Sequence, residues 1–168
     1  MSSYKPEAMK MSEATPVPDT SNAIQIRPFA PEDRQAWEPL WQGYLTFYKS
    51  TLAPEVTDTT WERLLDPAEP MHGLAATLNG GIVGIVHYLY HRSTWSIGNY
   101  CYLQDLFTSE AARNRGVGRA LIEAVYEKAR GDGASRVYWL THETNTSAQA
   151  LYDKIAVKSG FIQYRQVF

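Results

Sequence analysis

Three arginines and two glycines crowd together just before an aliphatic helix pattern, in the stretch LFTSEAARNRGVGRALIEAV, residues 106–125. Their positions are Arg113, Arg115, Gly116, Gly118 and Arg119. The start of a helix presents free backbone N–H groups and the positive end of the helix dipole. Glycines let a bulky anion approach that backbone, and arginines add charge-assisted hydrogen bonds. The stretch therefore predicts a cradle for a phosphate or pyrophosphate, although a glycine-requiring loop with solvated arginines fits the spacing equally well.

Two widespread phosphate-binding patterns do not fit this stretch. No Gly-Lys-Ser/Thr follows the glycines, so the stretch is not a Walker loop. The third glycine of the dinucleotide fingerprint is missing, and the preceding strand is not the first strand of the chain. An anion site of another kind is the remaining functional interpretation.

Alternation and helical spacing of apolar residues predict the elements that position this stretch. In chain order they are a strand at 24–29, helices at 31–48 and 58–67, strands at 72–78, 82–90 and 99–108, a helix at 116–131, a strand at 135–141, a helix at 146–159 and a strand at 160–168. Pro39 should kink or divide the first helix. Asn79-Gly80 indicates an antiparallel hairpin, and the late strand–helix–strand units imply parallel pairing. The prediction is a mixed α/β fold.

Composition limits the class of protein. The 168 residues are 44% hydrophobic and 20% charged, with a formal net charge of −2. These values favour one globular domain and argue against a nucleic-acid binder with a broad basic surface. No apolar run approaches the roughly 20 residues of a membrane helix. Cys101 is the single cysteine, which excludes an internal disulfide and favours a cytoplasmic location.

The N-terminal segment, residues 1–22, is rich in Pro, Ser, Thr and charged residues and lacks the hydrophobic centre of a secretion signal. We expect it to be a flexible lead-in, followed by a single domain over residues 23–168. Docking of part of the lead-in on the domain is the alternative.

Three segments, taken together, resemble the GNAT superfamily of N-acetyltransferases. Arg113-x-x-Gly116-x-Gly118 is similar to the Gln/Arg-x-x-Gly-x-Gly/Ala loop that binds the acyl-CoA pyrophosphate in this family. The segment LQDLFT, residues 103–108, is closest to the Leu-Glu-Asp-Phe/Leu-Phe-Val segment of the diamine and polyamine acetyltransferase branch. The family pattern Asn-x-x-Ala-x-x-Leu-Tyr is matched by Asn145, Ala148, Leu151 and Tyr152.

The resemblance implies both a fold and a cosubstrate site. The fold is a mixed, mostly antiparallel central sheet in the order β-α-α-β-β-β-α-β-α-β, splayed between its fourth and fifth strands. Acetyl-CoA lies in that gap, and no metal is implied. Its pantetheine arm pairs with the backbone of Leu106, Phe107 and Thr108 and meets Asn145 and Ala148. Its pyrophosphate is held by the loop residues Arg113, Asn114, Arg115, Gly116, Val117, Gly118 and Arg119.

The resemblance also implies direct acyl transfer from the thioester to an amine. Tyr152 matches a tyrosine that acts as general acid toward the departing thiolate, although by spacing alone it reads as a core aromatic. A lysine-like amine, with a pKa near 10, must lose a proton to a base or through water. The related branch has a glutamate where this chain has Gln104, so the base or the residue that positions water is left open between Gln104 and Asp105. Glu143 is a further nearby carboxylate, and His87 and His142 are weaker candidates.

The expected function is acetyl-CoA-dependent N-acetylation of a primary amine in a small molecule, either a diamine or polyamine or an amino-acid-like compound. A protein or peptide N-acetyltransferase and a non-catalytic acyl-CoA sensor are the alternatives. An aromatic stripe on the predicted acceptor side is more often core than a cation-binding cage; it comprises Trp37, Trp41, Tyr44, Tyr48 and Trp61. The resemblance also implies a homodimer. The last predicted helix exceeds the usual family length by four residues, about one helical turn.

Overall fold

Asn79 and Gly80 form the tight turn between two long strands, β2 (Met71–Leu78) and β3 (Gly81–Ser93). Both turn residues have positive φ values, 51° and 80°, as the common two-residue hairpin turns require. The predicted hairpin is therefore confirmed. The structure, a computed structural model, describes residues 23–168, and the statements below concern that range.

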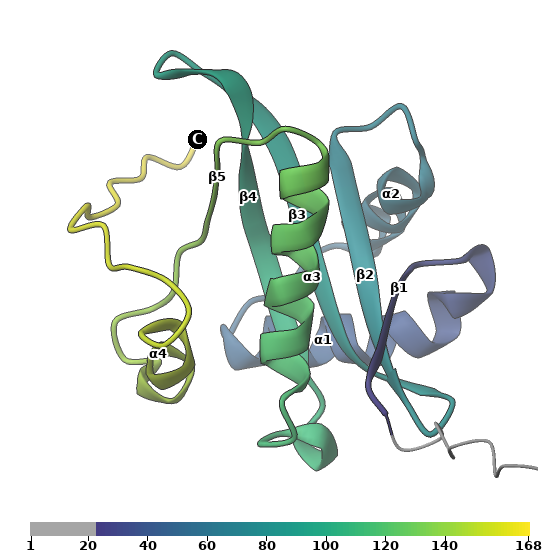
Figure 1. Cartoon of the computed structure of the whole chain (residues 1–168). Helices are drawn as coiled ribbons and strands as arrows, with labels where there is room; N and C mark the ends of the chain where they lie inside the picture. Colours follow the sequence, from purple (N-terminus) through teal and green to yellow (C-terminus); the bar gives the residue numbers. More distant parts are fainter. Residues whose placement is uncertain (1–22) are drawn as a thin grey trace, which may run out of the picture.

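The sheet has five strands in the order β1-β2-β3-β4-β5 (Figure 1). The remaining strands are β1 (Gln25–Pro28), β4 (Ser96–Thr108) and β5 (Arg136–Tyr138). Neighbouring strands run antiparallel except for β4 and β5, which run parallel. The expected mixed, mostly antiparallel α/β fold is confirmed.

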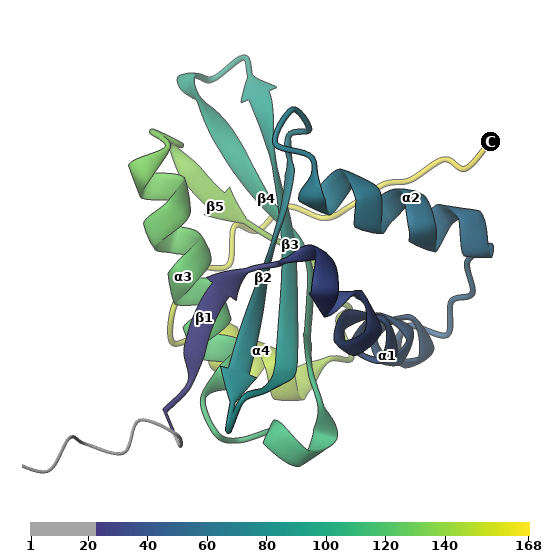
Figure 2. The same ribbon diagram turned by 90° about the vertical axis from the view of Figure 1, so that its right-hand side faces the viewer.

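Helices cover both faces of the sheet (Figure 2). One face carries α1 (Arg34–Phe47) and α2 (Pro54–Leu65), and the opposite face carries α3 (Val117–Gly131). The short helix α4 (Thr146–Tyr152) follows β5. α2 starts earlier than predicted because Pro54 suits a first helical turn. α1 continues through Pro39 without a break, so Pro39 does not divide it; the buried tryptophans on either side hold the helix on the sheet.

Each face of the sheet has its own apolar core. Beneath α3, the core comprises residues such as Leu121, Ile122, Val125, Val86 and Leu103. On the other face it comprises Trp37, Leu40, Trp41, Leu45, Trp61, Leu64 and Ile85. The three tryptophans of the aromatic stripe are thus core residues, which is the more common role of such a stripe.

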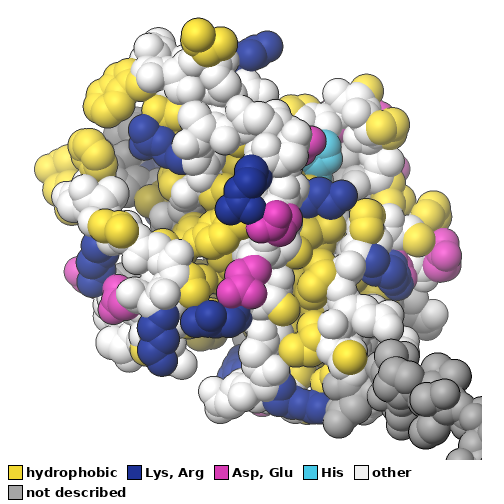
Figure 3. All heavy atoms as spheres, in the orientation of Figure 1, with side chains coloured by type: hydrophobic (Ala, Val, Ile, Leu, Met, Phe, Trp, Pro, Cys, Tyr) yellow, Lys and Arg dark blue, Asp and Glu magenta, His cyan; other side chains and the backbone are white. Residues whose placement is uncertain are grey.

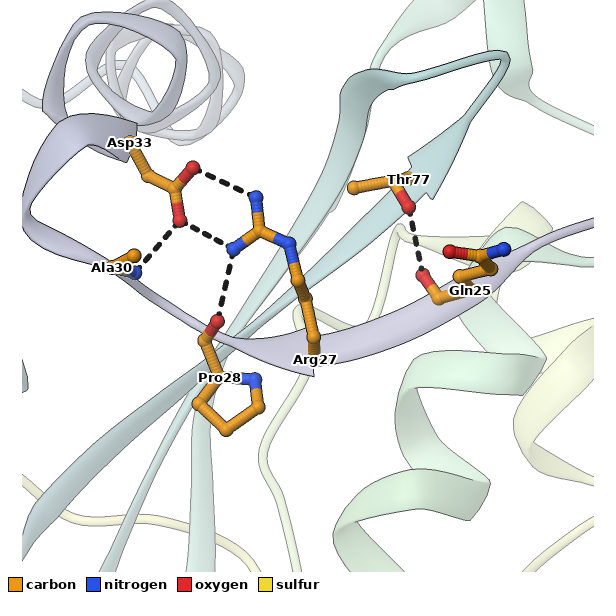
Figure 4. Close-up of polar contacts among 6 residues, drawn as sticks. All are labelled: Gln25, Arg27, Pro28, Ala30, Asp33 and Thr77. Atoms are coloured by element: carbon orange, nitrogen blue, oxygen red, sulfur yellow. Dashed lines mark hydrogen bonds and ion pairs between the residues drawn. The ribbon is translucent and has the colours of Figure 1, made fainter. Parts of the chain in front are cut away.

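An ion pair fixes the point at which the chain passes from β1 to α1 (Figure 4). Arg27 donates two hydrogen bonds to the carboxylate of Asp33, at 2.5 and 2.8 Å. The backbone N–H of Ala30 donates a further one at 2.8 Å. The hydrogen bond from Arg27 lowers the pKa of Asp33 below its usual value. The start of α1 is therefore anchored to the sheet, which positions the side chains that α1 presents to the candidate site.

α4 is much shorter than the helix predicted over residues 146–159. It ends at Tyr152 and continues as turns to Ala156. The turn is held by backbone hydrogen bonds from Ile155 and Ala156 to the Tyr152 carbonyl, and the Tyr126 hydroxyl donates to the Ile155 carbonyl at 3.1 Å. The extra residues therefore form a turn anchored on α3, and the expectation of an additional helical turn is wrong.

The last predicted strand, residues 160–168, is not formed. This segment runs extended away from the sheet, and its side chains are exposed (Figure 1). A strand is stable only when a neighbouring strand accepts and donates its backbone hydrogen bonds, and within the single described chain this segment has no such neighbour.

The predicted lead-in, residues 1–22, lies outside the described residues, so the domain boundary at residue 23 stays a prediction. Over residues 23–168, no helix combines the length and apolar character needed to cross a membrane.

Candidate active site

β4 and β5 pair for only a short distance and then separate. Their register joins residues 100–102 to residues 136–138, while β4 continues alone to Thr108. A small cavity lies where these two strands separate, and residues of α1 and α4 close its sides. Its lining residues are Tyr44, Tyr48, Leu103, Gln104, Leu106, Trp139, Leu140 and Tyr152. The splayed sheet that the sequence resemblance implies is therefore present.

A β-bulge in β4 sets the direction of the side chains at this point. His87 pairs with Asp105 and Tyr88 pairs with Leu103, so Gln104 is an extra residue without a partner on β3. Such a bulge changes which face each following residue occupies. Gln104 is exposed and lines the cavity, whereas Asp105 is buried on the face covered by α1.

Asp105 belongs to a buried chain of hydrogen bonds. The Trp37 indole N–H donates to His87 Nε2 at 2.9 Å, so this nitrogen carries no proton. The remaining proton of the neutral imidazole is on Nδ1, which lies 3.0 Å from Asp105 Oδ2 and donates to it. His87 is 3% exposed and Asp105 8% exposed. The order of donors makes the Asp105 carboxylate the final acceptor of this chain.

Tyr44 connects the buried carboxylate to the cavity. Burial raises the pKa of the Tyr44 hydroxyl far above its ordinary value, and the charge and hydrogen bond of Asp105 raise it further. Tyr44 also stacks on Trp41, with ring centroids 5.4 Å apart. Gly43, the preceding residue, lets α1 pack closely on β4, because a Cβ atom there would lie 2.7 Å from the Phe107 ring. The cavity therefore presents a protonated hydroxyl backed by a carboxylate.

Tyr152 enters the cavity from α4. Its ring packs edge-on against Trp139, with centroids 5.2 Å apart. Burial raises the pKa of Tyr152 to about 12, with a smaller contribution from Tyr48. The hydroxyl therefore keeps its proton at neutral pH and can act as a hydrogen-bond donor.

The predicted anion loop reaches the same region. Gly116 has a φ of 85° and immediately precedes α3. A Cβ atom on Gly118 would lie 3.7 Å from Leu151 Cδ2 and 4.0 Å from Thr108 Oγ1. The end of β4, the start of α3 and α4 thus meet at Gly118, and these elements carry the three motif segments singled out in the sequence.

The charged residues of this loop lie at the surface. Arg113 is 3.4 Å from Glu110, and Arg119 is 3.4 Å from Glu123. Because these pairs are about half exposed, water screens their attraction. Both guanidinium groups can therefore turn toward an anion at the start of α3.

The structure brings together most of the residues predicted for the site. Leu106, Phe107 and Thr108 form the end of β4, and residues 113–119 form the loop. Asn145 caps the start of α4 with its backbone, its side chain donates to the Thr141 hydroxyl at 3.1 Å, and Ala148 follows on the same helix. His142 and Glu143 are exposed on the preceding loop and do not line the cavity.

Other cavity residues were not selected from the sequence. Trp139 and Leu140 line the cavity, and the sequence predicts them only as part of a strand. Tyr44 and Tyr48 belong to the aromatic stripe, for which the sequence favours a core role over a cation-binding cage. Tyr44 is half-buried and Tyr48 is exposed, whereas Trp37 and Trp41, which come earlier in α1, are buried. Their hydroxyl groups were the available signal, because a polar tip on an aromatic stripe favours a partly wet position. Within the described range, no cluster of His, Cys, Asp and Glu suited to a metal ion occurs.

Comparison with protein families gives a match to the "Acetyltransferase (GNAT) family" over residues 34–156. Among characterised proteins, the D-amino-acid N-acetyltransferase HPA3 of Saccharomyces cerevisiae is 39% identical over 158 residues, covering 93% of this chain and 98% of that protein. The thialysine N-epsilon-acetyltransferase of Caenorhabditis elegans is 33% identical over 85 residues, covering 51% of this chain and 52% of that protein.

Solved structures show the same fold. A structure of AAC(6')-Iy in complex with the bisubstrate analog CoA-S-monomethyl-acetylneamine superimposes with a TM-score of 0.76. The superposition covers 88% of this chain and 99% of the AAC(6')-Iy chain, at 16% sequence identity. This likeness concerns the arrangement of helices and strands.

Proposed function

We propose that this chain, which belongs to the acetyltransferase (GNAT) family and is an N-acetyltransferase, transfers the acetyl group of acetyl-CoA to the primary amine of a small, amino-acid-like molecule. The observation that carries this proposal is the meeting of the Gly118 loop, the end of β4 and α4 beside one cavity. The relatives that act on D-amino acids and on thialysine support an amino-acid-like acceptor.

The residues around Gly118 fit acetyl-CoA. No atom lies within 4 Å of a Cβ placed on Gly116, so the backbone at the start of α3 is open to a bulky group. α3 has no side-chain cap at its first turn, which leaves backbone N–H groups for a pyrophosphate. Arg113, Arg115 and Arg119 would add positive charge there, and Leu106 to Thr108 would hold the pantetheine arm. When bound, acetyl-CoA supplies the activated acetyl group.

Tyr152 and Asp105 have separate roles in this proposal. The amine nitrogen forms a bond to the acetyl carbon as the carbon–sulfur bond breaks. Tyr152 donates a hydrogen bond or a proton to the departing sulfur. The amine proton passes to the Tyr44 hydroxyl while Tyr44 gives its own proton to Asp105, so no free tyrosinate forms. Trp37 and His87 position the carboxylate, and Gln104 orients the amine or a water in the cavity.

The cavity walls favour a small acceptor. Tyr44, Tyr48 and Trp139 offer aromatic faces, which attract cationic groups. Asp105 adds a negative charge behind them, which attracts an ammonium group entering the site. The resemblance of LQDLFT to the diamine and polyamine branch adds diamines and polyamines as a second class of acceptor.

A panel of amines tests the function. We expect thiol release from acetyl-CoA with D-amino acids or thialysine, measured against L-amino acids, spermidine, an aminoglycoside and a histone-like peptide. Release with the peptide alone would indicate a protein acetyltransferase. Binding of acetyl-CoA without release for any amine would indicate an acyl-CoA sensor.

Tyr44→Phe tests the proposed proton route. We expect kcat to fall about tenfold at neutral pH, less than the 10²–10⁴-fold typical of a lost general base, because water can replace the hydroxyl. The loss should shrink as the pH approaches the amine pKa near 10, where more free amine is present. Initial rates across this pH range measure the effect.

Tyr90→Phe is the matched control for that variant. The Tyr90 hydroxyl also donates to an aspartate, Asp132, at 2.6 Å, but neither residue lines the cavity. Its kcat should stay at the wild-type value. An equal loss in both variants, or a loss in Tyr44→Phe that does not change with pH, would contradict the proton route.

We also propose a reducing, cytoplasmic location. Cys101 is buried, and burial raises the pKa of its thiol to about 12. A thiol of such high pKa is a poor nucleophile, and a chain with one cysteine cannot use an internal disulfide for stability.

A further inference from the structure

Three tyrosines and a histidine form a continuous aromatic surface on one face of the sheet. They are His91 of β3, Tyr100 and Tyr102 of β4, and Tyr138 of β5. Tyr102 stacks on Tyr138 with ring centroids 5.0 Å apart. His91 packs edge-on against Tyr100 and Tyr138, at 5.7 and 5.8 Å, and its Nε2 lies 2.9 Å from the Tyr138 hydroxyl. We call these four residues the aromatic face.

The aromatic face lies on the side of the sheet opposite α3. Cys101 and Leu103 belong to the core beneath α3. Tyr100 and Tyr102 alternate with them along β4, so the two tyrosine side chains lie on the other face of the sheet. All four residues of the aromatic face are half-buried, and within the described range none of them belongs to either apolar core. Around α3, by contrast, the surface carries side chains of both charges (Figure 3). The rings of the aromatic face are therefore available to a ligand.

The aromatic face adjoins the cavity of the candidate active site. Tyr102 and Tyr138 come directly before the chain segments that line this cavity. Burial raises the pKa of Tyr102, and the charge of Asp105 raises it further, which indicates that the Tyr102 hydroxyl lies near this carboxylate. An acceptor whose amine lies at Tyr44 and Asp105 can therefore extend its remaining part over Tyr102 and Tyr138.

The far end of the aromatic face is positively charged. The Arg136 guanidinium lies 4.0 Å from the centre of the Tyr100 ring and donates a hydrogen bond to the Tyr100 hydroxyl at 2.7 Å. Arg136 pairs with Tyr100 in the sheet, two residues or about 7 Å beyond Tyr102 at ~3.3 Å per residue. A second positive charge on the acceptor is repelled at this end, whereas an uncharged ring is not.

We propose that the aromatic face is an acceptor subsite for an uncharged aromatic side chain, so that the preferred acceptors are aromatic amino acids rather than diamines or polyamines. This inference rests on the function proposed above. The charge of Asp105 attracts the acceptor ammonium group at the cavity, and Arg136 disfavours a second ammonium group at the other end. The acceptor ring packs on Tyr102 and Tyr138, which their mutual stacking already orders, so that little side-chain entropy is lost on binding.

A comparison of acceptors tests this preference. The value of kcat/KM for thiol release from acetyl-CoA is measured with phenylalanine, with alanine of the same configuration, with spermidine and with a histone-like peptide. We expect wild type to prefer phenylalanine over alanine by about tenfold, because the ring contacts two tyrosines, and to use spermidine less well than phenylalanine. A higher kcat/KM for spermidine or for the peptide than for phenylalanine would overturn the proposal.

Tyr102→Ala removes one ring of the subsite. We expect the ratio of kcat/KM for phenylalanine to that for alanine to fall about three- to tenfold, the range of one aromatic contact. The ratio does not depend on the fraction of folded enzyme, so a loss of stability cannot produce this change. Tyr90→Ala is the matched control, because Tyr90 is a half-buried tyrosine that packs on the core beneath α3. It should leave the ratio unchanged, and an equal fall in both variants would contradict the subsite.

Arg136→Glu tests the role of charge. We expect kcat/KM for spermidine to rise about two- to fivefold, the effect typical of an exposed charge pair, while the value for phenylalanine changes little. An unchanged value for spermidine would contradict the role of Arg136.

The same measurements separate failure of the subsite from failure of the proposed function. Equal use of alanine and phenylalanine by wild type, or a Tyr102→Ala enzyme with the wild-type ratio, overturns the subsite and leaves the acetyltransferase function in place. Absence of thiol release with every amine overturns the function, and the subsite with it.

Discussion

Tyr152→Phe should lower kcat by about 10²–10⁴-fold, the range typical of a lost acid–base group, while the affinity for acetyl-CoA stays nearly unchanged. The substitution keeps the ring, its contact with Trp139 and the short helix α4, and it removes one hydroxyl. Burial raises the pKa of that hydroxyl to about 12, so the wild-type enzyme holds the donated proton throughout the neutral range. An interaction made only in the transition state changes kcat rather than substrate binding. Steady-state kinetics and a binding titration measure the two quantities.

Tyr126→Phe is the control for this result. The Tyr126 hydroxyl supports the turn after α4 by donating to the Ile155 carbonyl, and Tyr126 does not line the cavity. Its loss should lower the melting temperature slightly and leave kcat close to wild type. A Tyr152→Phe enzyme that keeps more than about a third of wild-type kcat lies far outside the expected range; another group or water would then serve the thiolate.

Gly118→Glu should abolish the rise in melting temperature that acetyl-CoA produces, and with it the activity. A ligand that binds the folded state raises the melting temperature by mass action. The new side chain places bulk and negative charge where the pyrophosphate is expected. The fold should tolerate it, because a Cβ atom there meets Leu151 at an ordinary 3.7 Å and an acidic residue in the first turn of α3 suits the helix dipole.

Gly131→Glu provides the same substitution at the opposite end of α3. No atom lies within 4 Å of a Cβ at Gly131, and the helix places it about 20 Å from Gly118 at ~1.5 Å per residue. This variant should keep the full melting shift with acetyl-CoA. A folded Gly118→Glu protein with an unchanged shift would remove the loop from the cosubstrate site.

Local signals were sufficient for much of the fold. Asn79-Gly80 predicts a hairpin because few residue pairs adopt two successive positive φ values. The start of α3 follows from the glycines and arginines around Gly116, and the apolar stripe through Leu121 and Val125 predicts its buried face. These features depend on neighbouring residues, so the sequence pattern carries them.

The sequence pattern does not predict features that depend on contacts between residues far apart in the chain. The turn that follows α4 is anchored by a hydrogen bond between Tyr126 and Ile155, which are far apart in the chain. The pairing of Asp105 with His87 depends on strand register. The prediction that Gln104 and Asp105 point in different directions is correct, but the bulge that separates them is not visible in the sequence, nor is the approach of Tyr44 to Asp105 from α1.

The bulge at Gln104 also determines which changes of sequence the site can accept. The residue has no partner on β3, and its side chain points to the cavity, so exchanging glutamate for glutamine there alters the cavity and leaves the sheet intact. Deleting the residue would join Leu103 directly to Asp105, and because their partners Tyr88 and His87 are already neighbours on β3, the register of the sheet would be kept. Leu106 and Phe107 would stay on their present faces, and the cavity would lose one side chain. The bulge is therefore a position at which the site can change its chemistry, by substitution or by loss of one residue, while the sheet that supports it stays the same.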